Sequence, residues 1–214
     1  MRIGIIGSGN IGGTAARLFA HAGHPVALSN SRGPDSLTDL VASINAELPS
    51  PLVEATTSED AARSCDVVLL ALPWRAVDGY PAPELVAGKI VIDAMNPYTP
   101  EGGLEELGDS TSSGEVAARL PGARIVKAFN TIYWEHLASQ GRHDRLHADR
   151  RAIPLASDDA AAKARVARLI EEIGFAAVDS GTLRDGGRRQ QPGTPIYNRD
   201  ITGAAAEALL REEH

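Results

Sequence analysis

The sequence of 214 residues lacks several features that would define whole classes of protein. Cys65 is the single cysteine, so an internal disulfide is excluded and a buried, inert thiol is favoured over a redox centre. No apolar run approaches the ~20 residues of a membrane span. The run at residues 3–6 begins too early and is too short for a signal peptide. We therefore expect a cytoplasmic protein with no membrane partner.

Positive charge is also scarce. Lys and Arg total 21 against 28 Asp and Glu, which gives a net charge of −7, and both halves of the chain are acidic. Nucleic-acid binding depends on a basic patch, so no nucleic-acid partner is expected. His143 and His147 are four residues apart, but they lie among charges of both signs, so a solvated surface is favoured over a metal site.

Short apolar runs alternate with helical patterns along the chain. Strands are predicted at residues 2–6, 25–28, 53–55, 66–71, 89–93, 124–128, 152–156 and 176–178. Helices are predicted at residues 11–22, 36–47, 58–64, 157–173 and 201–211. The strands lack polar alternation, which is typical of a sheet covered by helices on both faces. We expect an α/β fold with a Rossmann-type doubly wound parallel sheet, forming one domain over residues 1–214.

A glycine-rich turn joins the first strand to the first helix. It reads Gly7-Ser8-Gly9-Asn10-Ile11-Gly12 and lies inside a strand–helix–strand unit, the context that makes a dinucleotide site. Gly7 permits the turn, Gly9 leaves room for a pyrophosphate, and Gly12 lets helix and strand pack closely. The unpaired N–H groups of the helix would face the anion. The alternative is a glycine-rich turn without a ligand.

The end of the second strand favours one cofactor. An NAD site usually has a carboxylate there to bind the ribose 2′-hydroxyl, but this sequence has Ser29-Asn30-Ser31-Arg32-Gly33. Ser31 can donate a hydrogen bond to a 2′-phosphate, and Arg32 a charge-assisted one. NADP(H) is therefore favoured over NAD. The alternative interpretations are a solvated Arg32 and an Asn30 that only forms a turn.

Polar and aromatic side chains follow three later strands. These segments are Leu72-Pro73-Trp74, Asp93-Ala94-Met95-Asn96-Pro97 and Ala128-Phe129-Asn130-Thr131-Ile132-Tyr133-Trp134. The carboxyl ends of parallel strands meet at one edge of a sheet, where ligands bind, so we expect one pocket there with Asn96 among its cofactor-binding residues. A strand terminator followed by a core tryptophan is the alternative for Pro73 and Trp74. Glu105, in a polar loop, is expected to be solvated.

These motifs, together with Gln191-Pro192-Gly193-Thr194-Pro195, resemble the NADP-dependent coenzyme F420 oxidoreductase family over nearly the whole chain. The resemblance implies a homodimer and a Rossmann domain with a small C-terminal extension, residues 181–214, that completes the substrate pocket. We expect residues 186–195 to form an ordered irregular loop, because they are rich in glycine and proline.

The resemblance also implies roles for individual residues. Ser8, Gly9, Asn10 and Ile11 would hold the pyrophosphate, Ser31 and Arg32 the 2′-phosphate, and Pro73, Trp74 and Trp134 the nicotinamide. Asn130, Thr194 and Pro195 would face the ring of a second substrate, coenzyme F420 or a flavin. Two positions depart from the family pattern, which has histidine at Asn130 and lysine at Ser36. The difference at Asn130 concerns whether a deazaflavin is the second substrate. The difference at Ser36 is expected to weaken the affinity for NADP without reversing the preference for it over NAD.

The implied reaction is hydride transfer between two stacked rings held roughly 3–3.5 Å apart, which asks little of side chains. We therefore expect no catalytic nucleophile, metal or general-acid triad. A proton for the acceptor ring would come from water or from a substrate-binding hydroxyl, Thr131 or Tyr197. Two alternatives stay open: an NADPH-dependent flavin, quinone or metal-chelate reductase, and a non-catalytic module that senses NADP(H).

Overall fold

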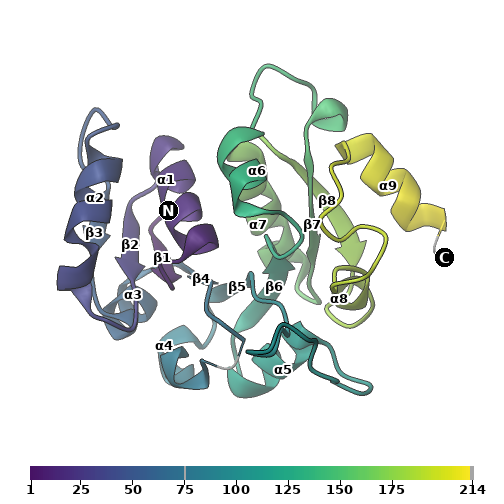
Figure 1. The fold of residues 1–214 in the computed structure, drawn as a ribbon, viewed down its shortest axis with the longest axis horizontal. Helices are drawn as coiled ribbons and strands as arrows, with labels where there is room; N and C mark the ends of the chain where they lie inside the picture. Colours follow the sequence, from purple (N-terminus) through teal and green to yellow (C-terminus); the bar gives the residue numbers. More distant parts are fainter. Residues whose placement is uncertain (75, 213–214) are drawn as a thin grey trace.

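The structure is a computed structural model that describes residues 1–74 and 76–212 (Figure 1). Within these residues the strands form one eight-stranded sheet in the order β3-β2-β1-β4-β5-β6-β7-β8. The strands are β1 (Ile3–Ile6), β2 (Val26–Ser29), β3 (Val53–Ala55), β4 (Val67–Leu70), β5 (Ile90–Asp93), β6 (Arg124–Ala128), β7 (Ala152–Ala156) and β8 (Ala176–Gly181). The predicted α/β fold of Rossmann type is confirmed.

Helices cover both faces of the sheet. They are α1 (Asn10–His21), α2 (Thr38–Asn45), α3 (Ser58–Ser64), α4 (Pro83–Val86), α5 (Ser112–Arg119), α6 (Trp134–Ser139), α7 (Ala160–Glu172), α8 (Asp185–Arg189) and α9 (Gly203–Glu212). Side chains of α1, α2, α6 and α7 form one core cluster, which includes Phe19, Ile44, Leu137 and Ile170. Side chains of α3, α4 and α5 form another, and α9 packs on β7 and β8 through Ala206 and Leu210.

One strand pair runs against the prediction of a parallel sheet. β6 and β7 are antiparallel, whereas every other neighbouring pair is parallel. A parallel crossover needs a dozen or more residues to return to the opposite edge of the sheet. The connection here, residues 129–151, is long enough for a crossover, but its helices are short: the six-residue α6 and a three-residue 3-10 helix at His147–Asp149. The chain after α6 stays at the edge where β6 ends, and there the Arg142 amide donates a hydrogen bond to the Gly174 carbonyl (2.8 Å), which lies between α7 and β8.

The glycine-rich C-terminal segment is more regular than predicted. Residues 186–189, expected as irregular loop, belong to α8 (Asp185–Arg189). Gly186 allows a close contact, since a Cβ there would lie 2.8 Å from the carbonyl of Ser180 in β8. Gln190, which follows the helix, is completely buried. The glycines therefore permit tight helix–sheet packing, which composition alone cannot distinguish from loop structure.

The sheet order places a crevice between β1 and β4. The chain moves outward from β1 through β2 to β3, and then returns to β4 on the other side of β1. Connections from β1 and β4 therefore diverge at their carboxyl ends, which is where ligands bind in sheets of this kind. The glycine loop after β1 and the Leu72-Pro73-Trp74 segment after β4 border this crevice.

Candidate functional site

The three glycines of the loop meet three different steric demands. Gly7 has a φ of +108°, and a Cβ there would overlap the Ala71 carbonyl after β4. A Cβ on Gly12 would overlap the Gly7 carbonyl, so the helix can approach the loop only without a side chain. At Gly9, by contrast, a Cβ would meet nothing within 4 Å. The chain could tolerate a side chain at Gly9, so its absence leaves space for a ligand.

The start of α1 offers donors to that space. Gly9 is the N-cap and provides no side-chain cap, and the first intrahelical bond joins the Gly13 amide to the Gly9 carbonyl (2.8 Å). The amides of Asn10, Ile11 and Gly12 therefore have no partner within the helix. Unpaired amides at a helix N-terminus bind anions such as pyrophosphate.

Asn30 organises the loop after β2, a role that the sequence did not suggest beyond turn formation. Its Oδ1 accepts a hydrogen bond from the Arg32 amide (2.9 Å), which confirms the turn. Its Nδ2 donates to the hydroxyls of Ser8 (3.1 Å) and Ser36 (3.0 Å). Asn30 thus joins the glycine loop to the loop that carries Ser31 and Arg32. Ser36, where the family pattern has lysine, is part of this network.

Ser31 and Arg32 are exposed at the carboxyl end of β2. Within the part of the chain that the structure describes, the Arg32 guanidinium makes no hydrogen bond or ion pair. An arginine without an acidic partner is available for an anion. The loop contains no carboxylate that would repel a phosphate until Asp35.

Two cavities flank the segment after β4. One, of about 900 Å³, lies on the β2 side and is lined by Asn30, Ser31, Ser58, Pro73 and Tyr80, among others. The other, of about 560 Å³, lies on the β5 side and is lined by Gly9, Trp74, Met95, Asn96 and Tyr98, among others. Leu72 and Pro73 border both cavities. The site therefore has one compartment on each side of the crevice, as an extended dinucleotide requires.

Trp74 forms part of the wall of the second cavity. Its side chain is 8% exposed and packs in a core cluster, and it also lines the cavity. Trp74 is therefore both a core residue and a residue of the candidate site. Its indole Nε1 donates a 2.7 Å hydrogen bond to the Glu105 carboxylate. The prediction that Glu105 is only solvated is therefore wrong. Glu105 fixes the orientation of the tryptophan ring.

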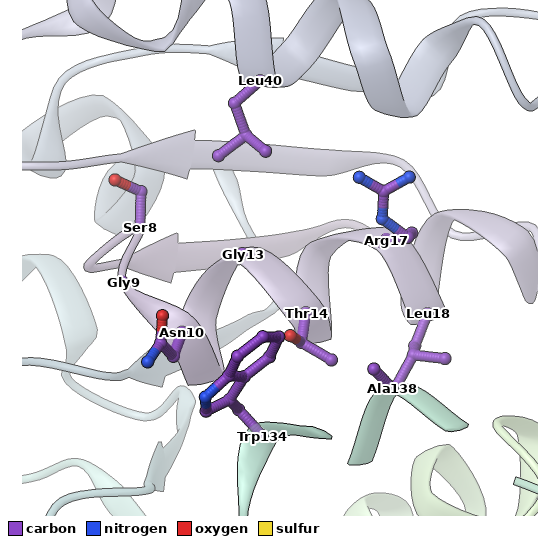
Figure 2. A pocket seen from close by; sticks show the side chains of 10 residues that line it. All are labelled: Ser8, Gly9, Asn10, Gly13, Thr14, Arg17, Leu18, Leu40, Trp134 and Ala138. Carbon is purple, nitrogen blue, oxygen red and sulfur yellow. The ribbon is translucent and has the colours of Figure 1, made fainter. Parts of the chain in front are cut away.

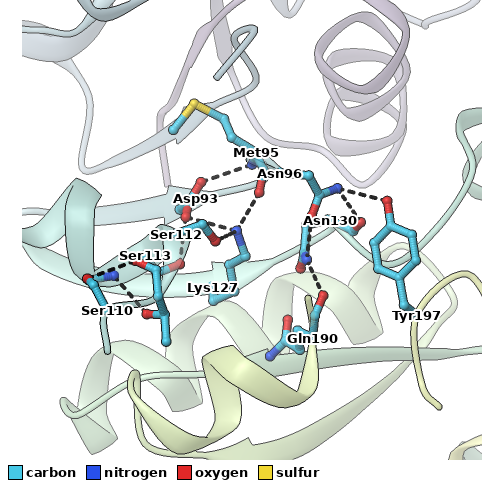
Figure 3. Close-up of polar contacts among 12 residues, drawn as sticks. Asp93, Met95, Asn96, Ser110, Ser112, Ser113, Lys127, Asn130, Gln190 and Tyr197 are labelled. Carbon is cyan, nitrogen blue, oxygen red and sulfur yellow. Dashed lines mark hydrogen bonds and ion pairs between the residues drawn. The ribbon is translucent and has the colours of Figure 1, made fainter. Parts of the chain in front are cut away.

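A chain of amide groups lies behind this cavity (Figure 3). The Asn130 Nδ2 donates to Asn96 Oδ1 (3.0 Å) and to the Gln190 carbonyl (2.8 Å), and Asn96 Nδ2 donates to the Asn130 carbonyl (2.9 Å). Asn130 is 4% exposed, so the structure places it behind Asn96 and not in the open cavity. The Oδ1 of Asn130 and the hydroxyl of Thr131 are buried without a hydrogen-bond partner among the described residues.

Phe129 sets the direction of this segment. It has a φ of +68°, is completely buried, and packs edge-to-face on Phe19 of α1 at a centroid distance of 6.0 Å. A bulky residue in the left-handed region costs of order 1–3 kcal/mol and persists only where the surrounding structure fixes it. The strained turn brings Asn130 and Thr131 to the carboxyl end of β6.

A buried ion pair supports the floor of the site (Figure 3). The Lys127 ammonium lies 3.0 Å from the Asp93 carboxylate and also donates to the Met95 carbonyl and to the Ser112 hydroxyl. Burial lowers the pKa of Lys127, and the neighbouring Asp93 opposes that shift. Asp93 accepts further bonds from the Ser113 hydroxyl (2.6 Å) and the Met95 amide (2.9 Å). The network fixes Met95 and Asn96 beneath the cavity, and no sequence motif predicted the ion pair.

The structure separates Trp134 from the other predicted nicotinamide neighbours. Trp134 is 40% exposed at the start of α6 and lines a different cavity, of about 360 Å³, along α1. Figure 2 shows its indole beside the first turns of α1. Asn10 borders this cavity as well as the one that contains Trp74, so the start of α1 lies between the two tryptophans.

The C-terminal residues are brought to the site in part. Tyr197 reaches it, since its hydroxyl accepts a hydrogen bond from Asn96 Nδ2 (3.1 Å). The Thr194 hydroxyl instead donates within its own turn, to the carbonyls of Arg189 (2.6 Å) and Gln191 (2.8 Å), and Pro195 is exposed. The roles of Thr194 and Pro195 toward a second ring remain predictions.

The described residues contain no group of three or more His, Cys, Asp or Glu that could hold a metal ion. Cys65 is buried, and burial raises the pKa of its thiol, which disfavours the reactive thiolate. None of the helices in residues 1–74 and 76–212 is long and apolar enough to cross a membrane.

These features define a dinucleotide-binding protein of the Rossmann class. They are the glycine loop that is unobstructed at Gly9, the unpaired amides at the N-terminus of α1, and the two cavities on either side of the crevice between β1 and β4. The residues present therefore fit a bound dinucleotide.

Comparisons with known proteins extend this assignment. The family described as "NADP oxidoreductase coenzyme F420-dependent" matches residues 2–97. The structure of the hypothetical protein SMa0349 from Sinorhizobium meliloti is 34% identical, with a TM-score of 0.81 over 94% of this chain and 95% of that one. The structure of a proposed F420-dependent NADP reductase from Arthrobacter sp. FB24 is 26% identical, with a TM-score of 0.73 over 94% of this chain and 99% of that one.

More distant structures share the fold alone. An imine reductase from Myxococcus stipitatus, solved with NADP⁺, is 14% identical with a TM-score of 0.62, and the match spans 61% of that chain. The family assignment rests on the nearer matches, and it confirms the resemblance drawn from the motifs. Residues 2–97 belong to the NADP oxidoreductase, coenzyme F420-dependent family, and the protein is an NADP-dependent oxidoreductase.

Proposed function

We propose that this protein transfers hydride between NADPH and a planar ring acceptor, with the deazaflavin coenzyme F420 as the first candidate. The observation that carries the proposal is the cavity of about 560 Å³ on the β5 side of the crevice, which opens between the glycine loop and Trp74. Bound NADPH supplies the hydride, and the protein supplies the position of both rings.

The chain's own residues divide the work of binding. The amides of Ser8 to Ile11 would hold the pyrophosphate, and Ser31 with Arg32 would bind the 2′-phosphate at the β2 side. Pro73 and Trp74 would border the nicotinamide, and the bond from Trp74 to Glu105 (2.7 Å) keeps the indole from rotating into that space. Positioning of this kind supplies most of the rate of a direct hydride transfer.

The identity of the acceptor is the open part of the proposal. The 26% identical neighbour from Arthrobacter is named for F420 dependence, which supports the deazaflavin. Asn130 favours a second candidate, a flavin or quinone acceptor, because it replaces the histidine of the family pattern and bonds inward to Asn96 and Gln190. The homodimer implied by the resemblance and the cytoplasmic location expected from the sequence stay predictions.

The test is to mix the protein with NADPH and with coenzyme F420, FMN or menadione in turn, and to follow the loss of absorbance of the reduced nicotinamide. We expect turnover with coenzyme F420 to exceed turnover with the other two. Faster reduction of FMN or menadione would favour the second candidate. Tight NADPH binding without turnover of any acceptor would contradict the proposal and favour a non-catalytic sensor of NADP(H).

A further inference from the structure

Tyr98 is an aromatic residue of the β5-side cavity that the motifs did not single out. It lies five residues after β5, in a hairpin where it pairs with Leu104. Its side chain is 42% exposed although it lines the cavity together with Trp74 and Asn96. A phenol at the mouth of a proposed hydride-transfer site can reach both the ligand and the solvent.

The Tyr98 hydroxyl ends a chain of hydrogen bonds that begins in the protein interior. Asn96 Nδ2 donates to the Asn130 carbonyl (2.9 Å), and this bond assigns the amide, because a carbonyl can only accept. The same Nδ2 therefore also donates to the Tyr197 hydroxyl oxygen (3.1 Å). The hydroxyls of Tyr197 and Tyr98 then lie 3.0 Å apart.

Either hydroxyl could donate in the last bond, and this order is compatible with donation from Tyr197 to Tyr98. The Tyr197 oxygen already accepts from Asn96, so its own hydrogen can be donated to Tyr98. Burial, with the hydrogen bond to Tyr98, raises the pKa of Tyr197, so Tyr197 keeps its proton. In this arrangement the hydrogen of Tyr98 is left for a group in the cavity.

Resting on the proposed function, we infer that Tyr98 is a catalytic residue that donates a proton to the acceptor ring, and that Tyr197 is a positioning residue that acts through it. Hydride brings a hydrogen and an electron pair to the ring, and negative charge develops on a ring nitrogen or oxygen. The Tyr98 O–H bond breaks and an N–H or O–H bond forms on that atom. The phenolate regains its proton from solvent, because Tyr98 is exposed.

Proton donation from Tyr98 suits one class of acceptor. A planar, conjugated ring with a nitrogen or oxygen that becomes basic on reduction, as in a flavin, deazaflavin or quinone, uses both the hydride and the proton. Before reduction the same atom would accept a hydrogen bond from Tyr98, so the residue contributes to binding as well as to the reaction. A hydrogen bond of this kind changes affinity about fivefold.

The test compares wild type, Tyr98→Phe and Tyr197→Phe, with Tyr133→Phe as matched control. Tyr133 is 54% exposed and makes an edge-to-face contact with His136 (5.9 Å). Three quantities are measured: the Kd of NADPH, the Kd of the oxidised acceptor in the presence of NADP⁺, and kcat. The acceptor is whichever of coenzyme F420, FMN and menadione the wild type reduces fastest.

We expect Tyr98→Phe to lower kcat about 100-fold, the lower end for loss of general acid catalysis, and to weaken acceptor binding about fivefold. The Kd of NADPH should stay within twofold, which also shows that the fold is intact. Tyr197→Phe should lower kcat less and enlarge the solvent deuterium isotope effect on kcat, because proton donation from Tyr98 becomes slower. A purely structural role would leave that isotope effect unchanged.

Three outcomes would count against the inference. A Tyr98→Phe variant with wild-type kcat and acceptor affinity would overturn it while leaving the proposed function intact. A fall in kcat in Tyr133→Phe equal to that in Tyr98→Phe would show a general effect of the site mouth and overturn it as well. Wild type that binds NADPH but reduces no acceptor would overturn the proposed function, and this inference with it.

Discussion

Arg32 provides the most specific test of the preference for NADPH over NADH. Its guanidinium has no partner within the described chain, and the 2′-phosphate that it would bind is present in NADPH and absent from NADH. A charge-assisted hydrogen bond is worth about 1.5–3 kcal/mol, and Arg32 is exposed, so the lower value applies. Arg32→Ala should therefore raise the Kd of NADPH about tenfold. The Kd of NADH, which lacks the 2′-phosphate, should change less than twofold.

Arg32→Glu places a negative charge beside the phosphate and should weaken NADPH further, on the order of 100-fold at low salt, with a smaller effect at high salt because the site is exposed. Fluorescence titration of each reduced cofactor measures both constants. Arg2→Ala is the matched control, since Arg2 forms an exposed ion pair with Glu54 beside the amino end of β1. Equal losses for NADPH and NADH would refute the role assigned to Arg32.

Two further predictions concern the glycine loop and the buried ion pair. Gly9→Val should abolish binding of NADPH and NADH but leave the melting temperature unchanged, because a Cβ at Gly9 meets only open space. Gly12→Ala should instead lower the melting temperature, since its Cβ would overlap the Gly7 carbonyl. Unaltered cofactor affinity in Gly9→Val would show that the glycine loop is not part of the site. Lys127→Met should lower the free energy of unfolding by about 3 kcal/mol, measured by urea denaturation, because the Asp93 carboxylate is left buried without its cation. Lys127→Met combined with Asp93→Asn should recover part of that loss, and a single-variant loss below about 1 kcal/mol would contradict the role of the pair.

Local patterns predicted the strands and the glycine loop well, because both depend on short-range chemistry. The segments 124–128 and 152–156 coincide with β6 and β7, and 58–64 with α3. The antiparallel turn of β7 was missed, because an apolar run reads the same in either direction. The path of the chain before β7 involves contacts such as the bond between Arg142 and Gly174, two residues far apart in the sequence.

Site residues could be predicted where they belong to a local sequence motif. They were harder to predict where the site is formed by side chains from distant segments of the chain. The sequence placed Asn96, Asn130 and Tyr197 near one edge, but it did not show that Asn130 bonds inward, which depends on the buried Gln190. Lys127 and Tyr98 escaped notice for a related reason. Neither belongs to a motif, and their partners Asp93 and Tyr197 lie on other segments of the chain.

The most direct test of the central claim is a crystal structure of the protein with NADP⁺. We expect the pyrophosphate at the amides that begin α1, the 2′-phosphate beside Ser31 and Arg32, and the nicotinamide in the cavity bordered by Trp74 and Asn96, with one face of its ring open to a second ring. A nucleotide bound elsewhere, or a nicotinamide covered on both faces by the protein's own residues, would contradict it.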